Sequence, residues 1–244
     1  MATEANGTPP IPTSRDVEYE AARAAILRGY SEGLLAAAQD QALSAEERAG
    51  WTRAEGLLAI RVADVPGTYR IPPNRTFADH LTLADPGTPI EVGFEGRANT
   101  EGDTVIWLPR QQVLIAGDIV VSPIPFEFNV YPAENIATLV GLRAYDYRVL
   151  IPGHGEALPD KRYLDLLIAF MRDVRARIAP LAQQGVTLEE ATARLDFTSY
   201  EQAFSGDDPW LRLWFRDYAL TPLLESAYRE AKGEPLGPPL IQAA

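Results

Sequence analysis

Three short stretches in the middle of the chain decide its fold: Gly96-Arg97-Ala98-Asn99-Thr100-Glu101-Gly102-Asp103, Leu114-Ile115-Ala116-Gly117-Asp118 and Pro152-Gly153-His154-Gly155. The second stretch is an apolar run that ends in a glycine and a carboxylate. The third follows the apolar pair Leu150-Ile151, and its proline and glycines predict a tight turn that projects an imidazole. Polar groups at the carboxyl ends of buried strands are typical of sites in layered α/β folds.

Each of these signals is weak alone, but together they resemble the metallo-β-lactamase fold family, and that resemblance implies Asp118 and His154 as metal ligands, with Asn99 as a weaker one. Carboxylate and imidazole both suit zinc or iron, whereas an amide offers only a neutral oxygen. Thr100 and Asp103 are expected to brace their loop through hydrogen bonds. The plainer alternatives are that Asp118 caps a turn and that His154 is a solvent-facing loop residue. No other side chain is assigned a catalytic role.

The order of the three stretches resembles the second half of the metallo-β-lactamase fold family, whose members hold one or two metal ions between loops. That family commonly has histidine where this chain has Asn99, and some of its branches carry asparagine there. Its other ligand motif, His-x-His-x-Asp-His, is absent from the chain, which has only two histidines. The other histidine, His80, falls in a strand-like run and is expected to be an ordinary, partly exposed strand residue.

The resemblance implies an α/β (α+β) fold, half of an αβ/βα sandwich with N-terminal and C-terminal helices. It also implies zinc as the cofactor and hydrolysis of an ester, thioester, amide or phosphoester bond in a small-molecule substrate. Because the chain supplies only part of the ligand set, we expect weak metal binding and little turnover alone. The alternative is a non-catalytic pseudoenzyme or a dimeric interaction protein built on the half-fold.

A half-sandwich leaves one apolar face of its sheet without the second sheet that normally packs on it. We expect one of three arrangements. The leading helices fold back over that face, a second copy covers it in a homodimer, or the chain is a fragment that lacks its N-terminal half.

Periodicity divides the chain into a leader (1–15), a helical segment (16–65), a sheet with the motif loops (75–155) and C-terminal helices (160–235); residues 16–235 and the tail to 244 form one partial domain. Short strands are predicted within 77–83, 90–94, 104–108, 113–116 and 148–151, with a helix over 133–145. Their short spacing favours antiparallel neighbours. Capping boxes at Ser44 and Thr187, and Asp208-Pro209, predict helix starts.

Composition narrows the class of protein. A chain of 244 residues with 46% apolar residues can bury a core, and a net charge of −12 argues against binding nucleic-acid phosphates. The absence of cysteine excludes thiolate metal sites and disulfides. The chain has neither a secretory signal nor an apolar run of the ~20 residues that cross a bilayer, so we expect a cytoplasmic protein without membrane partners.

Overall fold

The computed structural model describes residues 14–64, 75–83, 87–128 and 131–236. The chain divides into two compact units, Met1–Thr76 and Phe77–Ala244. The predicted leader lies almost wholly outside the described residues, and the predicted domain boundaries stay a prediction. In the described part of the chain, no helix is both long and apolar enough to cross a membrane.

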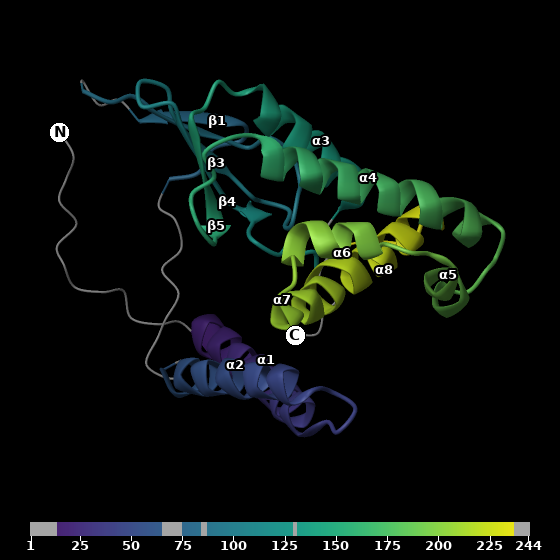
Figure 1. The fold of residues 1–244 in the computed structure, drawn as a ribbon. Coiled ribbons are helices and arrows are strands. Elements are labelled where there is room, and N and C mark those ends of the chain that lie inside the picture. Colours follow the sequence, from purple (N-terminus) through teal and green to yellow (C-terminus); the bar gives the residue numbers. More distant parts are fainter. Residues whose placement is uncertain (1–13, 65–74, 84–86, 129–130, 237–244) are drawn as a thin grey trace. The chain divides into compact units, whose positions relative to one another are not determined.

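The first unit contains two helices that pack side by side, α1 (Ser14–Gln39) and α2 (Ala45–Asp64) (Figure 1). The predicted capping box before α2 is confirmed, because Glu47 N donates to Ser44 Oγ at 3.2 Å and Ser44 N donates to Glu47 Oε2 at 2.8 Å. The Ser31 hydroxyl joins the helices by donating to Glu55 at 3.1 Å.

The second unit is built on one five-stranded sheet in the order β1-β2-β3-β4-β5. Its strands are β1 (His80–Leu83), β2 (Ile90–Gly93), β3 (Val105–Leu108), β4 (Val113–Val121) and β5 (Val149–His154). The first three pairings are antiparallel, as the short spacings predict. The last is parallel, because helix α3 (Pro132–Ala144) carries the chain back between β4 and β5.

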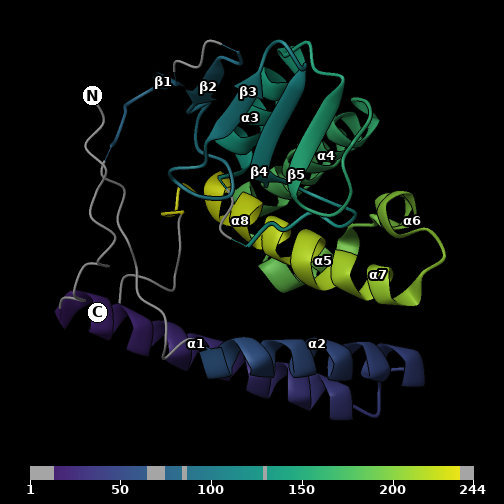
Figure 2. The ribbon, with the colours of Figure 1, turned by 90° about the vertical axis from the view of Figure 1, so that its left-hand side faces the viewer.

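One face of this sheet is covered by α3 and by α4 (Arg162–Gln183), which lie next to each other behind it (Figure 2). Leu114 of β4 and Leu150 of β5 point to this face and are fully buried. Trp107, which pairs with Leu114, contacts the ring of Tyr145 just after α3, with 5.5 Å between the ring centroids. Helix α4 contributes an apolar stripe at helical spacing that is entirely buried: Leu164, Leu167, Phe170, Met171, Val174 and Ile178.

The other face carries an apolar row that crosses all five strands. Strand pairing places its members directly opposite one another: Leu81, Val92, Ile106, Ile115 and Ile151. Each is only half-buried. Every strand among the described residues belongs to this one sheet, so none of them forms a second sheet over the row. We call this row the bare-face row.

The C-terminal helices are α5 (Leu188–Arg194), α6 (Thr198–Ser205), α7 (Pro209–Trp214), η2 (Phe215–Leu220) and α8 (Thr221–Ala231). Two predicted starts are confirmed: Thr187 Oγ1 accepts from Glu190 N, and Asp208 Oδ1 accepts from Trp210 N. From Pro209 to Ala231 these elements follow one another without a break, and the middle widens to π geometry in η2.

Pro222 accounts for part of this change. Proline has no N–H, so the carbonyl of Tyr218, four residues earlier, loses its usual helical donor. That carbonyl instead accepts from the backbone N–H of Glu127, at 2.9 Å. The loop that follows β4 therefore hydrogen-bonds to η2 at the Tyr218 carbonyl.

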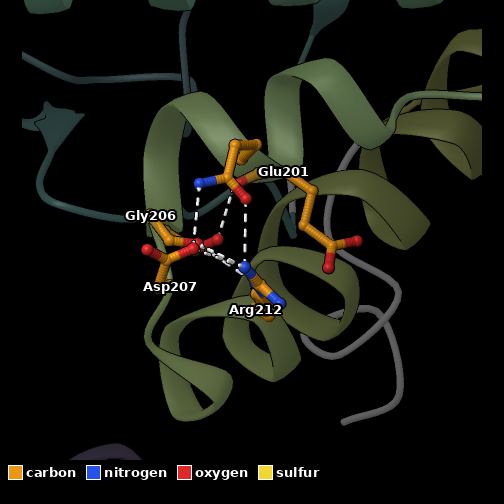
Figure 3. A network of polar contacts seen from close by, with 6 residues as sticks. Glu201, Gly206, Asp207 and Arg212 are labelled. Atoms are coloured by element: carbon orange, nitrogen blue, oxygen red, sulfur yellow. Dashed lines mark hydrogen bonds and ion pairs between the residues drawn. The ribbon is translucent and has the colours of Figure 1, made fainter.

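The turn between α6 and α7 is held by Arg212 (Figure 3). Its guanidinium donates to Gly206 O at 2.9 Å, to Gln202 Oε1 at 3.0 Å and to Asp207 Oδ1 at 3.2 Å. Gly206 has a positive φ of 56°, so glycine suits this bend. The carboxylate of Glu201 makes none of the contacts drawn. The network has a structural role, because it holds the turn between α6 and α7.

Candidate metal centre

Asp118 and His154 lie beside each other at one edge of the sheet. Asp118 belongs to β4 and His154 is the last residue of β5, and His154 Nε2 is 3.6 Å from Asp118 Oδ1. Both side chains are well exposed, 51% for Asp118 and 70% for His154, so ions and solvent can reach both. The structure therefore brings together the two leading candidates.

Both strands run further than the sequence pattern predicts. β4 was expected to end at Ala116 and continues to Val121, and β5 was expected to end at Ile151 and continues to His154. Irregular register makes this possible, because Gly117, with a φ of 54°, pairs with Pro152, and Val121 then pairs with His154. Asp118 thus lies within an irregular strand rather than after a regular one.

Close backbone contacts at two glycines, Gly153 and Gly155, hold Asp118 and His154 in position. A Cβ at Gly153 would lie 1.9 Å from Asp118 Oδ1 and 2.8 Å from Asp118 N, so no side chain fits there. A Cβ at Gly155 would lie 2.2 Å from Ser122 O, and Ser122 N donates to His154 O at 3.2 Å. The spacing of the two candidate ligands is therefore set by the main chain.

Asn99 lies in the first motif loop and is buried, with 7% of its surface exposed. Its Oδ1 accepts no hydrogen bond among the described residues, so this oxygen is an orphaned acceptor. Its neighbours brace the loop: Thr100 N donates to Asp103 Oδ2 at 2.6 Å, and Thr100 Oγ1 donates to Asp103 Oδ1 at 2.8 Å. These are contacts of the kind expected for Thr100 and Asp103.

The same loop is tied to the start of α3. Arg97 Nε donates to Glu134 Oε2 at 2.8 Å, and its guanidinium stacks 4.2 Å above the ring of Tyr131. Hydrogen bonding from Arg97 lowers the pKa of Glu134. Tyr131 OH in turn donates to Glu101 Oε1 at 3.0 Å, and burial raises the pKa of Tyr131. The sequence analysis did not single out Glu101, although an acidic residue within a ligand loop is a usable signal.

His80 stands apart from this group. It opens β1, at the opposite edge of the sheet from β5, and it is exposed. This matches the expectation of an ordinary strand residue. It does, however, give the chain a second histidine that can serve as a control for His154.

The donors present do not fit a resident zinc ion. A catalytic zinc site uses three protein ligands and one open position. The described residues contain no group of three or more His, Cys, Asp or Glu side chains placed to hold a metal. One carboxylate, one imidazole and a buried amide oxygen fall short of that set, so no metal-dependent step is derived for the chain alone.

A second polar group, missed from the sequence, lies in the loop after β4. Glu127 has 3% of its surface exposed, and burial raises the pKa of its carboxyl to about 8. Nearby Tyr163 of α4 donates to Val121 O at 2.5 Å and to Pro123 O at 3.2 Å, which fixes the start of the loop. No sequence pattern distinguishes Glu127 from a solvated acidic residue.

Comparison with known proteins gives these residues a context. The model of the metallo-beta-lactamase superfamily matches residues 24–154. A linear primary-alkylsulfatase from Pseudomonas sp. (strain ATCC 19151) is 25% identical over 201 residues, which cover 77% of this chain and 35% of that protein. The chain thus spans about a third of the length of this curated relative.

Two solved structures are also similar. A double mutant of the sec-alkyl sulfatase PisA1 has 19% identity and a TM-score of 0.52, covering 66% of this chain and 27% of that one. A metallo-beta-lactamase from Pontibacter korlensis has 25% identity and a TM-score of 0.37, covering 48% of this chain and 55% of that one. The first likeness supports the shared fold.

Proposed function

The chain belongs to the metallo-beta-lactamase superfamily, whose model covers more than half of it, and on this premise we propose that it is a hydrolase-like protein with an incomplete metal centre. Members of the superfamily are metal-dependent, typically on zinc. The observation that carries the proposal is the Asp118–His154 pair, held 3.6 Å apart. In this proposal the pair supplies two ligands, Asn99 a weak third, and the remaining ligands come from residues outside the described ones.

The proposed substrate class is an ester, with sulfate esters of alkyl alcohols as the first choice. Two similar proteins are named as alkylsulfatases, which supports this choice. Carboxylic and phosphoric esters remain in the panel, along with amides and thioesters, because likeness of fold does not set specificity. If the remaining ligands were supplied, zinc would bring Lewis acidity to such a reaction, with Asp118 and His154 among its ligands.

Zinc binding and turnover test the proposal together. After chelator treatment, the chain is titrated with zinc by calorimetry and assayed on an alkyl sulfate, a carboxylic ester and a phosphodiester. We expect weak, substoichiometric zinc and little turnover. His154→Ala and Asp118→Asn should abolish the residual binding, and His80→Ala, which removes the other exposed histidine, should leave it unchanged.

Two results would overturn this reading in different ways. Stoichiometric zinc with robust turnover by the isolated chain would show that the centre is complete. Residual zinc binding that survives both site variants would show that the pair is no ligand set.

The second candidate is a non-catalytic protein that uses the half-fold for association. The bare-face row favours it, because five aligned apolar side chains on one sheet face are typical of a surface that packs on another layer. A discrete dimer without zinc binding, measured by light scattering on the chelated chain, would support this candidate over the hydrolase-like one.

A further inference from the structure

The carboxyl of Glu127 is buried inside the second unit. Its Oε2 accepts no hydrogen bond among the described residues. Its neighbours in sequence face outward, since Phe126 is 39% exposed and Phe128 is 36% exposed. Burial with one oxygen that accepts no hydrogen bond favours the neutral acid over the anion.

One backbone hydrogen bond, a group of rings and the burial of Ile124 in the hydrophobic core hold this part of the chain, Ile124–Phe128, which we call the docked segment. Glu127 N donates to Tyr218 O, the acceptor that Pro222 leaves without a helical donor. The rings of Phe126 and Phe128 lie 5.9 Å and 5.2 Å from the ring of Tyr218.

The groups around Glu127 do not compensate a negative charge. Tyr163 of α4 directs its hydroxyl proton to backbone carbonyls, and its pKa is raised by burial first and by Glu127 second. On η2, Arg216 and Asp217 are exposed. Burial is the cause that raises the pKa of Glu127.

We propose that the docked segment is a pH-dependent flap, which stays on η2 while Glu127 is protonated and is released when Glu127 ionises. Release would reach the candidate metal centre, because the segment begins two residues after Ser122, whose N–H donates to His154 O. The switch requires neither metal nor turnover, so it stands or falls separately from the proposed function.

Hydrogen exchange of the Glu127 amide tests the flap, because that N–H is protected only while the segment is docked. Opening releases one proton between the pKa of an exposed glutamate and that of the docked one. After correction for intrinsic rates, the protection factor should therefore fall about tenfold per pH unit between pH 5.5 and 7.5. Glu127→Gln should abolish this slope, and Glu225→Gln, which removes an exposed carboxylate from α8, should keep it.

Three results would overturn the flap. The first is a protection factor that does not change with pH in the unaltered chain. The second is the same slope for the Leu114 amide in the core, which would mean that the whole unit unfolds. The third, which needs no variant, is an NMR titration of the Glu127 carboxyl carbon with its midpoint near that of an exposed glutamate.

Discussion

The two faces of the sheet have similar apolar side chains but different surroundings. On β4, Leu114 is fully buried under α3 and α4, whereas its neighbour Ile115 points to the other face and is half-buried. Strands that are buried on both faces read as continuous apolar runs, and Val113-Leu114-Ile115-Ala116 is such a run. β4 therefore has the sequence of a two-sided core strand, and the second unit provides helices for one side.

The largest expected effect is on the covered face. Leu114→Ala removes three carbons from the covered face, and Ile115→Ala removes three carbons from the other face. We expect Leu114→Ala to lower the unfolding free energy by ~3 kcal/mol because it leaves a cavity in the core. Ile115→Ala should lower it by ~1 kcal/mol, because solvent already reaches the side chain.

Urea unfolding of the two variants and of the unaltered chain measures this difference. Equal losses for Leu114→Ala and Ile115→Ala would contradict it, since they would mean that both faces are packed alike in the isolated chain.

The next largest effect concerns the buried carboxyl of Glu127. The pKa of Glu127 is raised in the folded protein to about 8, so the folded state binds a proton that the unfolded chain releases near pH 4.5. Stability from this proton is present at low pH and is lost as pH rises toward 8. We expect a loss of ~1.4 kcal/mol per pH unit within that window.

Urea unfolding at pH 5.5, 6.5 and 7.5 measures this loss as the difference between the unaltered chain and Glu127→Gln. The glutamine variant should lack the slope contributed by this site. Parallel pH profiles for the two proteins would show that Glu127 does not cause this pH dependence of stability.

Polar substitutions in the bare-face row should have little effect on the unfolding free energy. Ile106→Thr with Ile151→Thr keeps β-branched shape and reduces apolar surface on that face. We expect the unfolding free energy to change by less than ~1 kcal/mol, and self-association in sedimentation experiments to fall. The control is Val140→Thr, an exposed position on α3 that should leave association unchanged.

A loss of stability for the double variant as large as that for Leu114→Ala would break the comparison. It would place a packed layer over the bare-face row within a single chain.

The smallest effect is expected at the edge where Asp118 and His154 lie. Both side chains are exposed, so Asp118→Asn and His154→Ala should each change the unfolding free energy by less than ~0.5 kcal/mol. Thermal melts without added metal measure this. A change of several degrees would indicate that the pair has a structural role that its exposure does not suggest.

Much of the architecture could be predicted because it depends on local signals. The capping boxes at Ser44 and Thr187, the strand positions and the antiparallel order follow from short patterns of residues. The Asp118–His154 pair could be predicted because the Gly-Asp and Pro-Gly-His-Gly motifs occur together in the order of the resembled family. Whether Asn99 acts as a ligand stays a prediction.

Other features depend on tertiary contact and have no local signal. The π turn of η2 combines the missing N–H of Pro222 with a donor from a loop about ninety residues earlier, since Glu127 N fills the Tyr218 carbonyl. The neutrality of Glu127 follows from its burial, which a single acidic letter between two phenylalanines does not reveal. The extension of β4 past Ala116 depends on an irregular register that only the partner strand defines.

Gly153 has a consequence for how such a protein changes over generations. The absence of a side chain there lets the Asp118 carboxylate approach the main chain of β5. Loss of the remaining ligands would leave that close approach intact, whereas one added methyl group at this position would force the strands apart.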